Sequence, residues 1–155
     1  MALRNIITVG DPILRKVSRK VEKFDDRLGQ LLDDMAETMY KAPGVGLAAV
    51  QVGILRRVVT IDVGDGLMEL VNPEIIEREG EQESVEGCLS VPGESGVVIR
   101  PETVKVQAQN RRGEWMVFKA HGYKATCVCH ELDHLEGVLY TDKMIRRPTK
   151  ADLEK

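Results

Sequence analysis

The most regular pattern of hydrophobic residues along the chain lies in residues 25–40. Its apolar positions recur three and four residues apart, which places them on one face of a helix. These positions are Leu28, Leu31, Leu32, Met35 and Met39. Asp25 or Asp26 can cap the start of the helix with a carboxylate oxygen, and Pro43 and Gly44 end it. We therefore predict an N-terminal helix that packs its apolar face into the core.

Later segments of the chain have the pattern of strands. Residues 103–109 alternate between apolar and polar side chains, as a strand does when one of its faces is buried. The predicted strands, separated by turn residues, are 57–63, 68–71, 97–100, 103–109 and 115–119. A second helix is predicted over residues 125–136. This order of elements favours an α+β fold with antiparallel or mixed sheets over a doubly wound parallel sheet.

Length and composition narrow the class of protein. A chain of 155 residues without repeats or linkers predicts one domain over residues 1–155, because a single core typically spans about 100–200 residues. The contents of 43% hydrophobic and 30% charged residues exclude a disordered tail, a collagen-like repeat and a disulfide mini-protein. No apolar run approaches the roughly 20 residues that a membrane span requires, so no membrane partner is expected.

The charge balance and the N-terminal segment bear on partners and location. Lys and Arg number 22 and Asp and Glu 25, which gives a net charge of −3. This balance makes nucleic acid a poor default partner, although a local basic patch is compatible with it. The first apolar stretch breaks at residues 10–12, too early for a secretory signal. We expect a cytoplasmic protein, with an organellar form that has lost a transit peptide as the alternative.

The candidate chemistry lies in the second predicted helix, where residues 130–134 read H-E-L-D-H. Positions four apart share one face of a helix, so the imidazoles of His130 and His134 can bind the same metal ion. Glu131 beside them can act as a general base on a water bound to that metal. We therefore predict that the sheets pack around a central helix that carries a metal centre.

A catalytic centre with two histidines needs a third protein ligand. Tyr140 stands where a third histidine would complete the pattern H-E-x-x-H-x-x-G-x-x-H, so that pattern fails. The remaining choices are His121, Cys88 and Glu154, which lies twenty residues after His134. Cys88 is favoured over Glu154, because a metal stabilises a thiolate and Glu154 lies in a polar terminal segment. The residues alone leave the choice open.

Three sequence blocks, in this order, resemble the peptide deformylase family. Residues 44–51 read G-V-G-L-A-A-V-Q, residues 86–90 read E-G-C-L-S, and residues 130–137 read H-E-L-D-H-L-E-G. The resemblance covers about residues 5–145. It implies a hydrolase that removes the formyl group from N-formylmethionyl nascent peptides and releases formate. It also implies one divalent metal ion, Fe(II) in the cell, with Ni, Co or Zn in other preparations.

The resemblance implies a role for each matching residue. The metal ligands would be Cys88, His130 and His134. A metal-bound hydroxide would attack the formyl carbon, with Glu131 as general base and then general acid. The developing oxyanion would be stabilised by the Gln51 side-chain amide and the Leu89 backbone N–H. Gly46 would bind the substrate backbone, and the methionine pocket would be lined by Val45, Tyr123, Thr126 and Cys127.

Some positions depart from the family pattern. Tyr123 and Thr126 are more polar than a typical methionine pocket, which predicts a shifted substrate preference. Cys129 replaces the glutamine that many members carry before the first motif histidine. The segment after residue 142 is short and contains Pro148, where bacterial members often carry a longer helix that helps docking on the ribosome. This weakens the expectation of a ribosome partner.

Two further hypotheses concern the surroundings of the motif. Arg100 is predicted to pair with Glu86 or Asp133 and so to orient the ligand helix, although Arg100 and Glu86 also fit a surface position. A rival function is a small endopeptidase that uses Glu154 as its third ligand. A second rival is a deformylase-like module that binds metal without catalysis; the intact Glu131 argues against it.

Overall fold

The computed structural model describes residues 2–154 of the chain. Its helices are α1 (Asp26–Lys41), α2 (Gly122–Leu135) and α3 (Lys150–Leu153), with 3-10 turns η1 (Pro12–Arg15), η2 (Ala49–Val52) and η3 (Tyr140–Asp142). Its strands are β1 (Gly46–Ala48), β2 (Val58–Ile61), β3 (Met68–Glu79), β4 (Gln82–Cys88), β5 (Val91–Arg100), β6 (Thr103–Gln109) and β7 (Trp115–His121). None of the helices in this part of the chain is long and apolar enough to cross a membrane.

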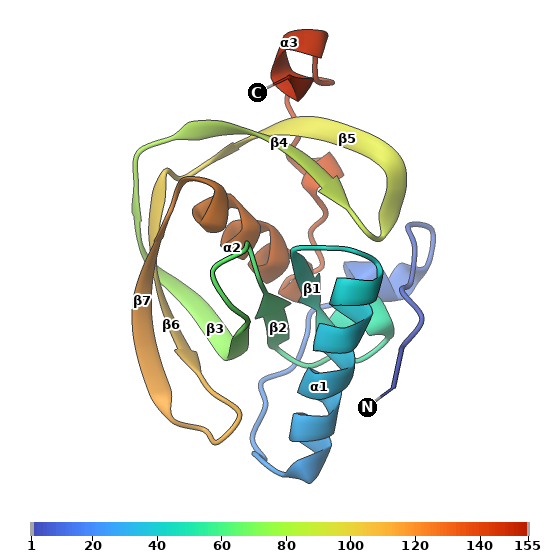
Figure 1. Ribbon diagram of the computed structural model, residues 1–155, viewed down its shortest axis with the longest axis vertical. Coiled ribbons are helices and arrows are strands. Elements are labelled where there is room, and N and C mark those ends of the chain that lie inside the picture. The colour runs from blue at the N-terminus through green and yellow to red at the C-terminus, as the bar shows by residue number, and fades with distance from the viewer. Residues whose placement is uncertain (1, 155) are drawn as a thin grey trace.

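The strands form two antiparallel sheets. The larger sheet has the order β1-β2-β3-β6-β7, and β4 pairs with β5 in a separate two-stranded sheet, which we call the β4–β5 ribbon. Figure 1 shows α2 between these two layers, with the ribbon arching over it and the larger sheet on its other side. The α+β prediction, with sheets around a central helix, is confirmed.

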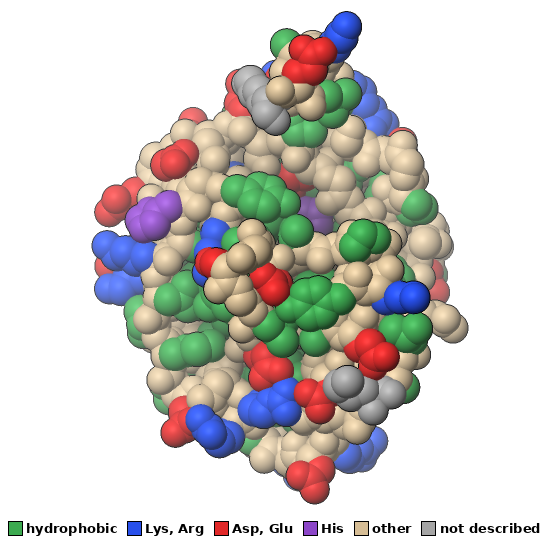
Figure 2. Space-filling model, in the orientation of Figure 1, with side chains coloured by type: hydrophobic (Ala, Val, Ile, Leu, Met, Phe, Trp, Pro, Cys, Tyr) green, Lys and Arg blue, Asp and Glu red, His purple; other side chains and the backbone are tan. Residues whose placement is uncertain are grey.

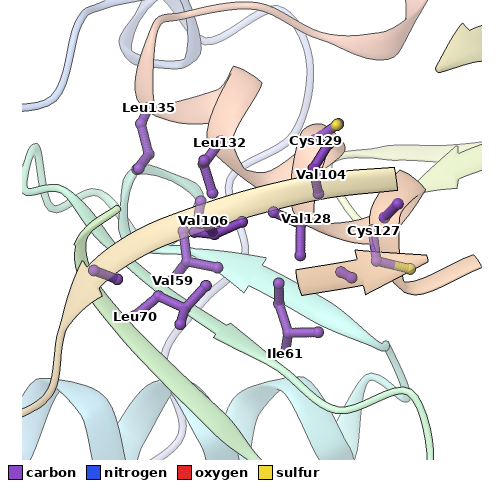
Figure 3. Packing of buried hydrophobic residues seen from close by; sticks show 14 of the residues in the cluster. Val59, Ile61, Leu70, Val104, Val106, Cys127, Val128, Cys129, Leu132 and Leu135 are labelled. Atoms are coloured by element: carbon purple, nitrogen blue, oxygen red, sulfur yellow. The ribbon is translucent and has the colours of Figure 1, made fainter. Parts of the chain in front are cut away.

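The main core fills the space between α2 and the larger sheet. Val128, Leu132 and Leu135 of α2 pack with Val59 of β2 and Val106 of β6, among others, and all five are buried (Figure 3). Burial of these side chains removes apolar surface from water, which is the dominant force for folding. The core thus holds one side of α2 against a rigid sheet, while its opposite side meets the ribbon.

The N-terminal helix has the predicted apolar face. Leu32, Met35 and Met39 are fully buried, in a second cluster that also contains Val58 of β2. Asp25 is the residue that caps the helix, because its Oδ1 accepts a hydrogen bond of 3.1 Å from the backbone N–H of Leu28. The predicted range of 25–40 differs from the observed one by a single residue at each end.

The strand predictions were accurate in some regions and wrong in others. Residues 103–109 coincide with β6, but β3 and β5 are much longer than predicted, and β2 is shorter. The strands β1 and β4 were not predicted at all. In β4 the buried positions include Ser84 and Glu86, so the strand lacks the apolar alternation that marks a buried face. The second helix begins at Gly122, three residues before its predicted start.

Candidate metal centre and catalytic pocket

The two motif histidines lie one turn apart on the side of α2 that faces the ribbon. Their ring centroids are 5.1 Å apart. Cys88 ends β4, and its Sγ lies 3.3 Å from His134 Nε2. One ligand atom from each of Cys88, His130 and His134 lies within 4.8 Å of the other two. Of the three choices for a third ligand, the fold therefore brings Cys88 to the histidines.

The other two choices lie elsewhere. His121 is exposed at the end of β7, where its Nδ1 is 2.9 Å from Thr103 Oγ1. Glu154 is exposed at the end of α3. Neither belongs to the group of ligand atoms around Cys88.

The chemistry of this donor set fits a divalent transition metal. A thiolate and two imidazoles suit zinc, iron(II), cobalt or nickel, whereas magnesium and calcium prefer oxygen ligands. Burial, with repulsion from His130, lowers the pKa of His134 to about 3, so this imidazole is neutral, as a ligand must be. Burial opposes a charge on His130, but Glu131, Cys88 and Glu86 raise its pKa well above the usual value. Groups that favour a proton on His130 would equally favour a metal cation bound there.

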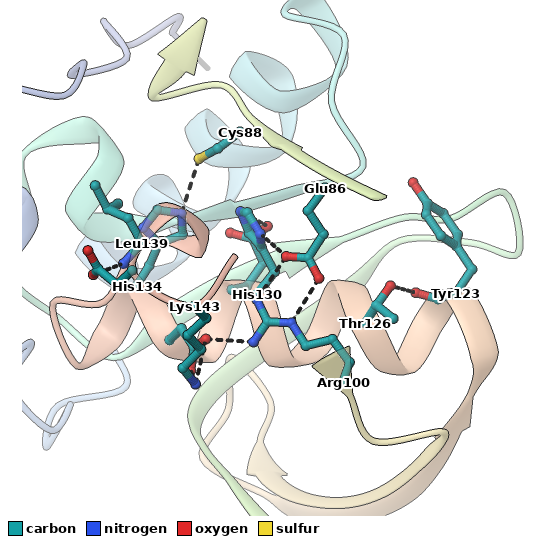
Figure 4. Close-up of polar contacts among 12 residues, drawn as sticks. Glu86, Cys88, Arg100, Tyr123, Thr126, His130, His134, Leu139 and Lys143 are labelled. Atoms are coloured by element: carbon teal, nitrogen blue, oxygen red, sulfur yellow. Dashed lines mark hydrogen bonds and ion pairs between the residues drawn. The ribbon is translucent and has the colours of Figure 1, made fainter. Parts of the chain in front are cut away.

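A buried ion-pair network orients His130. Arg100 donates from Nε and Nη2 to Glu86, both at 2.8 Å, and from Nη1 to Asp133 at 2.7 Å (Figure 4). Glu86 Oε1 also lies 2.9 Å from His130 Nδ1. Burial opposes ionisation of Glu86, but the bonds from Arg100 and His130 lower its pKa to about 2. The ionised carboxylate only accepts, so Nδ1 carries the hydrogen and Nε2 is left to bind a metal.

Arg100 thus pairs with both Glu86 and Asp133, the two partners predicted as alternatives. Its side chain is 3% exposed and that of Glu86 is 7% exposed, so neither is a surface charge. The contact to Asp133 joins the ribbon to α2. The network therefore links the two elements that supply the candidate metal ligands.

Glu131 is buried with one oxygen free. Its Oε2 lies 3.9 Å from His130 Nε2, and its Oε1 has no hydrogen-bond partner among residues 2–154. Burial raises the pKa of Glu131 to about 7, although His130 opposes this shift. A Cβ on Gly46 would lie 2.5 Å from Glu131 Oε2, so any other residue there would displace the carboxylate. This contact is a reason for glycine at position 46 that the sequence does not reveal.

Gln51 is fixed with its amide group toward Cys88. Gln51 Oε1 accepts a 2.9 Å hydrogen bond from Ala48 N–H, which determines the orientation of the amide. Gln51 Nε2 donates to Ser90 Oγ at 3.0 Å and lies 3.6 Å from Cys88 Sγ. One of its N–H groups is therefore taken by Ser90 and the other is directed at the Cys88 thiol, next to the candidate centre, where an oxyanion donor is needed.

These residues line a pocket of about 710 Å³ between α2, β4 and the chain before β1. Of the predicted site residues, those that line it are Val45, Gly46, Gln51, Cys88, Leu89, Tyr123, Thr126, Cys127, His130 and Glu131. His134 lies behind them and is 1% exposed. Figure 2 shows hydrophobic side chains in the middle of the face drawn, with Lys, Arg, Asp and Glu more frequent toward its edges.

Sequence reasoning missed several apolar residues of the pocket. Ile6, Val85 and Pro92 also line it. Val85 carried no signal, because it is an isolated apolar residue in β4, a strand without apolar alternation. Ile6 reaches the pocket from a segment with no regular structure, and nothing in its local sequence indicates that position.

Two residues of the pocket, Thr126 and Cys127, present less polar surface to a ligand than their residue types suggest. Thr126 Oγ1 donates a 2.8 Å hydrogen bond to the backbone oxygen of Tyr123, one turn earlier in α2. The hydroxyl of Thr126 is thereby already occupied. Cys127 is buried, and burial raises the pKa of its thiol to about 11, so it behaves as a small apolar group.

A glutamate in an H-E-x-x-H helix, beside a cysteine and two histidines whose ligand atoms lie together, defines the class of metal-dependent hydrolases. Comparisons with known proteins narrow this class. The sequence model described as Polypeptide deformylase matches residues 3–150, so the chain belongs to the polypeptide deformylase family.

Individual relatives agree with that assignment. A peptide deformylase of Acetivibrio thermocellus is 59% identical over 155 residues, covering 100% of this chain and 91% of its own. One of Caldicellulosiruptor bescii is 57% identical, covering 99% and 93%. The crystal structure of a peptide deformylase from Thermotoga maritima superimposes with a TM-score of 0.90 at 44% identity, covering 92% of this chain and 97% of that one.

Proposed function

We propose that this protein hydrolyses the N-terminal formyl group of N-formylmethionyl nascent peptides and releases formate and a free amino terminus. The observation that carries the proposal is the meeting of Cys88, His130 and His134 within 4.8 Å, beside a pocket lined by Cys88, His130 and Glu131, whose Oε1 has no hydrogen-bond partner among the described residues. Membership of the polypeptide deformylase family supports the same reaction. One domain, a cytoplasmic location and any contact with the ribosome stay predictions.

We assign the metal to Cys88, His130 and His134. The donor set and the hydrogen bond that leaves His130 Nε2 free support this assignment. The metal we expect is Fe(II), with Ni, Co or Zn as substitutes in preparations. A divalent ion bound there would act as a Lewis acid and lower the pKa of a water molecule to about 7.

Glu131 is the group that we assign to proton transfer. Its buried carboxyl, with a pKa raised to about 7, can accept a proton from the attacking water and return it to the leaving amine. Oε1 is the atom available for this step, because it has no hydrogen-bond partner among the described residues. Gly46 supports the role by leaving the space that the carboxylate occupies.

The remaining assignments concern the oxyanion and the peptide. We assign the Gln51 amide and the Leu89 backbone N–H to stabilise the oxyanion; one donor held in place in this way contributes about 3–4 kcal/mol. The backbone at Gly46 would hold the peptide. The methionine side chain would contact Val45, Tyr123, Thr126 and Cys127, which line the pocket.

The test is formate release from a formyl-Met tripeptide under anaerobic conditions with iron- or nickel-loaded protein. We expect turnover by the wild type and none by Glu131→Ala, while that variant keeps its metal. A folded, fully metallated wild type without turnover would exclude the proposed reaction. Metal loss in Glu131→Ala would instead contradict the assignment of Glu131 to proton transfer alone.

A further inference from the structure

The β4–β5 ribbon carries essential parts of the proposed centre but is not part of the larger sheet. Glu86 and Cys88 lie on β4, and Arg100 ends β5. Within residues 2–154 neither strand pairs with β1, β2, β3, β6 or β7. An isolated two-stranded hairpin is at best marginally stable in water. The position of Cys88 therefore depends on what else holds the ribbon against α2.

One such contact is a segment near the C-terminus that runs along the free edge of β5. We call residues 143–147 the clasp. The backbone N–H of Val97 donates to the oxygen of Arg146 at 3.0 Å, and Ile145 N–H donates back to the oxygen of Val97 at 2.8 Å. Figure 1 shows the chain leaving α2 and passing the ribbon on its way to α3. The clasp thus forms an isolated antiparallel bridge to β5 of the ribbon.

Two arginines of the clasp reach the ribbon with their side chains. Arg146 pairs with Glu83 of β4 at 2.9 Å and also contacts Asp152 of α3. Arg147 pairs with Glu94 of β5 at 3.2 Å and donates to the backbone oxygen of Ser95 at 3.0 Å. The clasp therefore contacts both strands of the ribbon.

Met144 connects the clasp to the candidate ligands through packing. Met144 and Cys88 pack against the same buried cluster, which consists of Val91, Val98, Leu139 and Tyr140. Tyr140 stacks on His130 with ring centroids 6.0 Å apart. A Cβ on Gly96 would lie 3.0 Å from Met144 Cβ and Sδ, so the Met144 side chain packs closely against the backbone of β5 at Gly96.

The clasp also contacts α2 directly. Lys143 Nζ lies 3.1 Å from Asp133 Oδ2, the oxygen that accepts from Arg100. The same segment thus touches the helix that carries His130 and His134 and the ribbon that carries Cys88. Fixing both elements fixes the distance between the ligand atoms that they supply.

We propose that the clasp is a positioning element for the metal centre, which holds Cys88 in place against His130 and His134 and so determines how tightly the metal is retained. Met144 and Arg146 are its main positioning residues. This inference rests on the ligand assignment proposed above. It adds that residues which never touch the metal govern its affinity through the placement of the thiolate.

The experiment loads the full chain with Co²⁺ and follows its transfer to a chelator, together with the thiolate-to-cobalt absorption band. In Met144→Ala and Arg146→Ala we expect Co²⁺ to leave about tenfold faster, the lower end of the loss seen when groups that orient metal ligands are removed. The thiolate band is expected to weaken or shift, since only Cys88 supplies sulfur to the assigned centre. Met144→Leu, which keeps most of the side-chain volume, should restore both values.

Two controls separate positioning from general stability. Arg112→Ala removes an exposed arginine from the β6–β7 turn and should leave Co²⁺ release unchanged. Leu32→Ala opens the core beneath α1, a cluster that contains none of the candidate metal ligands, and should lower Tm without weakening the thiolate band. If Leu32→Ala releases Co²⁺ as fast as Met144→Ala at an equal loss of Tm, the positioning role is wrong.

Other outcomes are equally decisive. Wild-type release rates in folded Met144→Ala and Arg146→Ala would overturn the role of the clasp while leaving the proposed function intact. A wild type that takes up Co²⁺ without a thiolate band would overturn the assignment of Cys88, and the proposed centre with it. The two failures are therefore distinguishable in one set of measurements.

Discussion

Two arginines in this protein each bind two carboxylates, and they do so in different surroundings. Arg100 bonds to Glu86 and Asp133 at 2.7–2.8 Å. Arg111 bonds to Glu69 and Asp33 at 2.6–2.9 Å. The Arg100 side chain is 3% exposed, whereas that of Arg111 is 38% exposed. The two networks have similar bond lengths but differ strongly in their access to water.

The difference in burial changes what each network does. An exposed ion pair contributes about 0–1 kcal/mol, because water and salt screen the charges. Removing one partner of a buried network costs about 3–5 kcal/mol, because the remaining charge is left without compensation. Arg111 joins the β6–β7 turn to β3 and α1 on the surface. Arg100 joins the ribbon to α2, and its partner Glu86 also orients His130.

The comparison predicts its largest effect for Arg100→Ala. This change leaves Glu86 buried with the imidazole of His130 as its remaining partner, and it leaves Asp133 paired with Lys143 alone. We expect the free energy of unfolding to fall by about 3–5 kcal/mol, measured by urea denaturation of the metal-free protein. Arg100→Lys keeps the charge but lacks the several planar N–H donors of the guanidinium. It should therefore restore only part of the free energy of unfolding that Arg100→Ala removes. An effect below that of Arg111→Ala would contradict the comparison.

Low pH should weaken the same network, because it protonates Glu86. The folded-state pKa of Glu86 is lowered to about 2 from a reference value of 4.5, so its contribution to stability is fully present above pH 4.5 and is lost as pH falls toward 2. The shift corresponds to about 3 kcal/mol. We expect Glu86→Gln to lack this part of the acid dependence of unfolding in the metal-free protein. Glu69→Gln, in the exposed network, serves as the control and should unfold in acid as the wild type does.

A smaller effect is expected on metal binding. Glu86→Gln keeps the shape of the side chain but replaces the carboxylate that accepts from His130 Nδ1. We expect the affinity for Co²⁺ or Zn²⁺ to fall about tenfold, because partners that orient a ligand imidazole typically contribute that much. Competition with a chelating dye measures the change. Equal affinity in Glu86→Gln and Glu69→Gln would show that the buried network does not act on the metal centre.

The two networks also illustrate which features of the fold could be predicted from the sequence and which could not. The apolar stripe of α1 and the alternation of β6 were predicted because local periodicity records their burial. The strand β4 was missed because burial of Glu86 depends on Arg100, which is fourteen residues away in the chain and lies on the neighbouring strand β5. Pairing of Arg100 was anticipated, but its double pairing was not. No local pattern distinguishes Arg100 from Arg111.

The candidate site shows the same limit. The H-E-x-x-H spacing and the E-G-C-L-S block indicated Cys88, His130 and His134, and the fold brings their ligand atoms together. The contact between Gly46 and Glu131 and the stacking of Tyr140 on His130 arise only when β1 and η3 fold against α2. Contacts of this kind depend on tertiary packing, which a single sequence does not display.

The smallest effect should follow Arg111→Ala, which removes the exposed arginine from both of its carboxylates. We expect the free energy of unfolding to change by less than about 1 kcal/mol, and the change to shrink further as salt is added. Metal affinity and formate release should equal those of the wild type, since the β6–β7 turn contacts none of the candidate ligands. The measurement is urea denaturation at low and high ionic strength, run beside Arg100→Ala. Arg111 and Arg100 each bind two carboxylates at similar distances but differ in exposure. A salt-independent loss of several kcal/mol would therefore mean that the two carboxylates, and not burial, determine the strength of such a network.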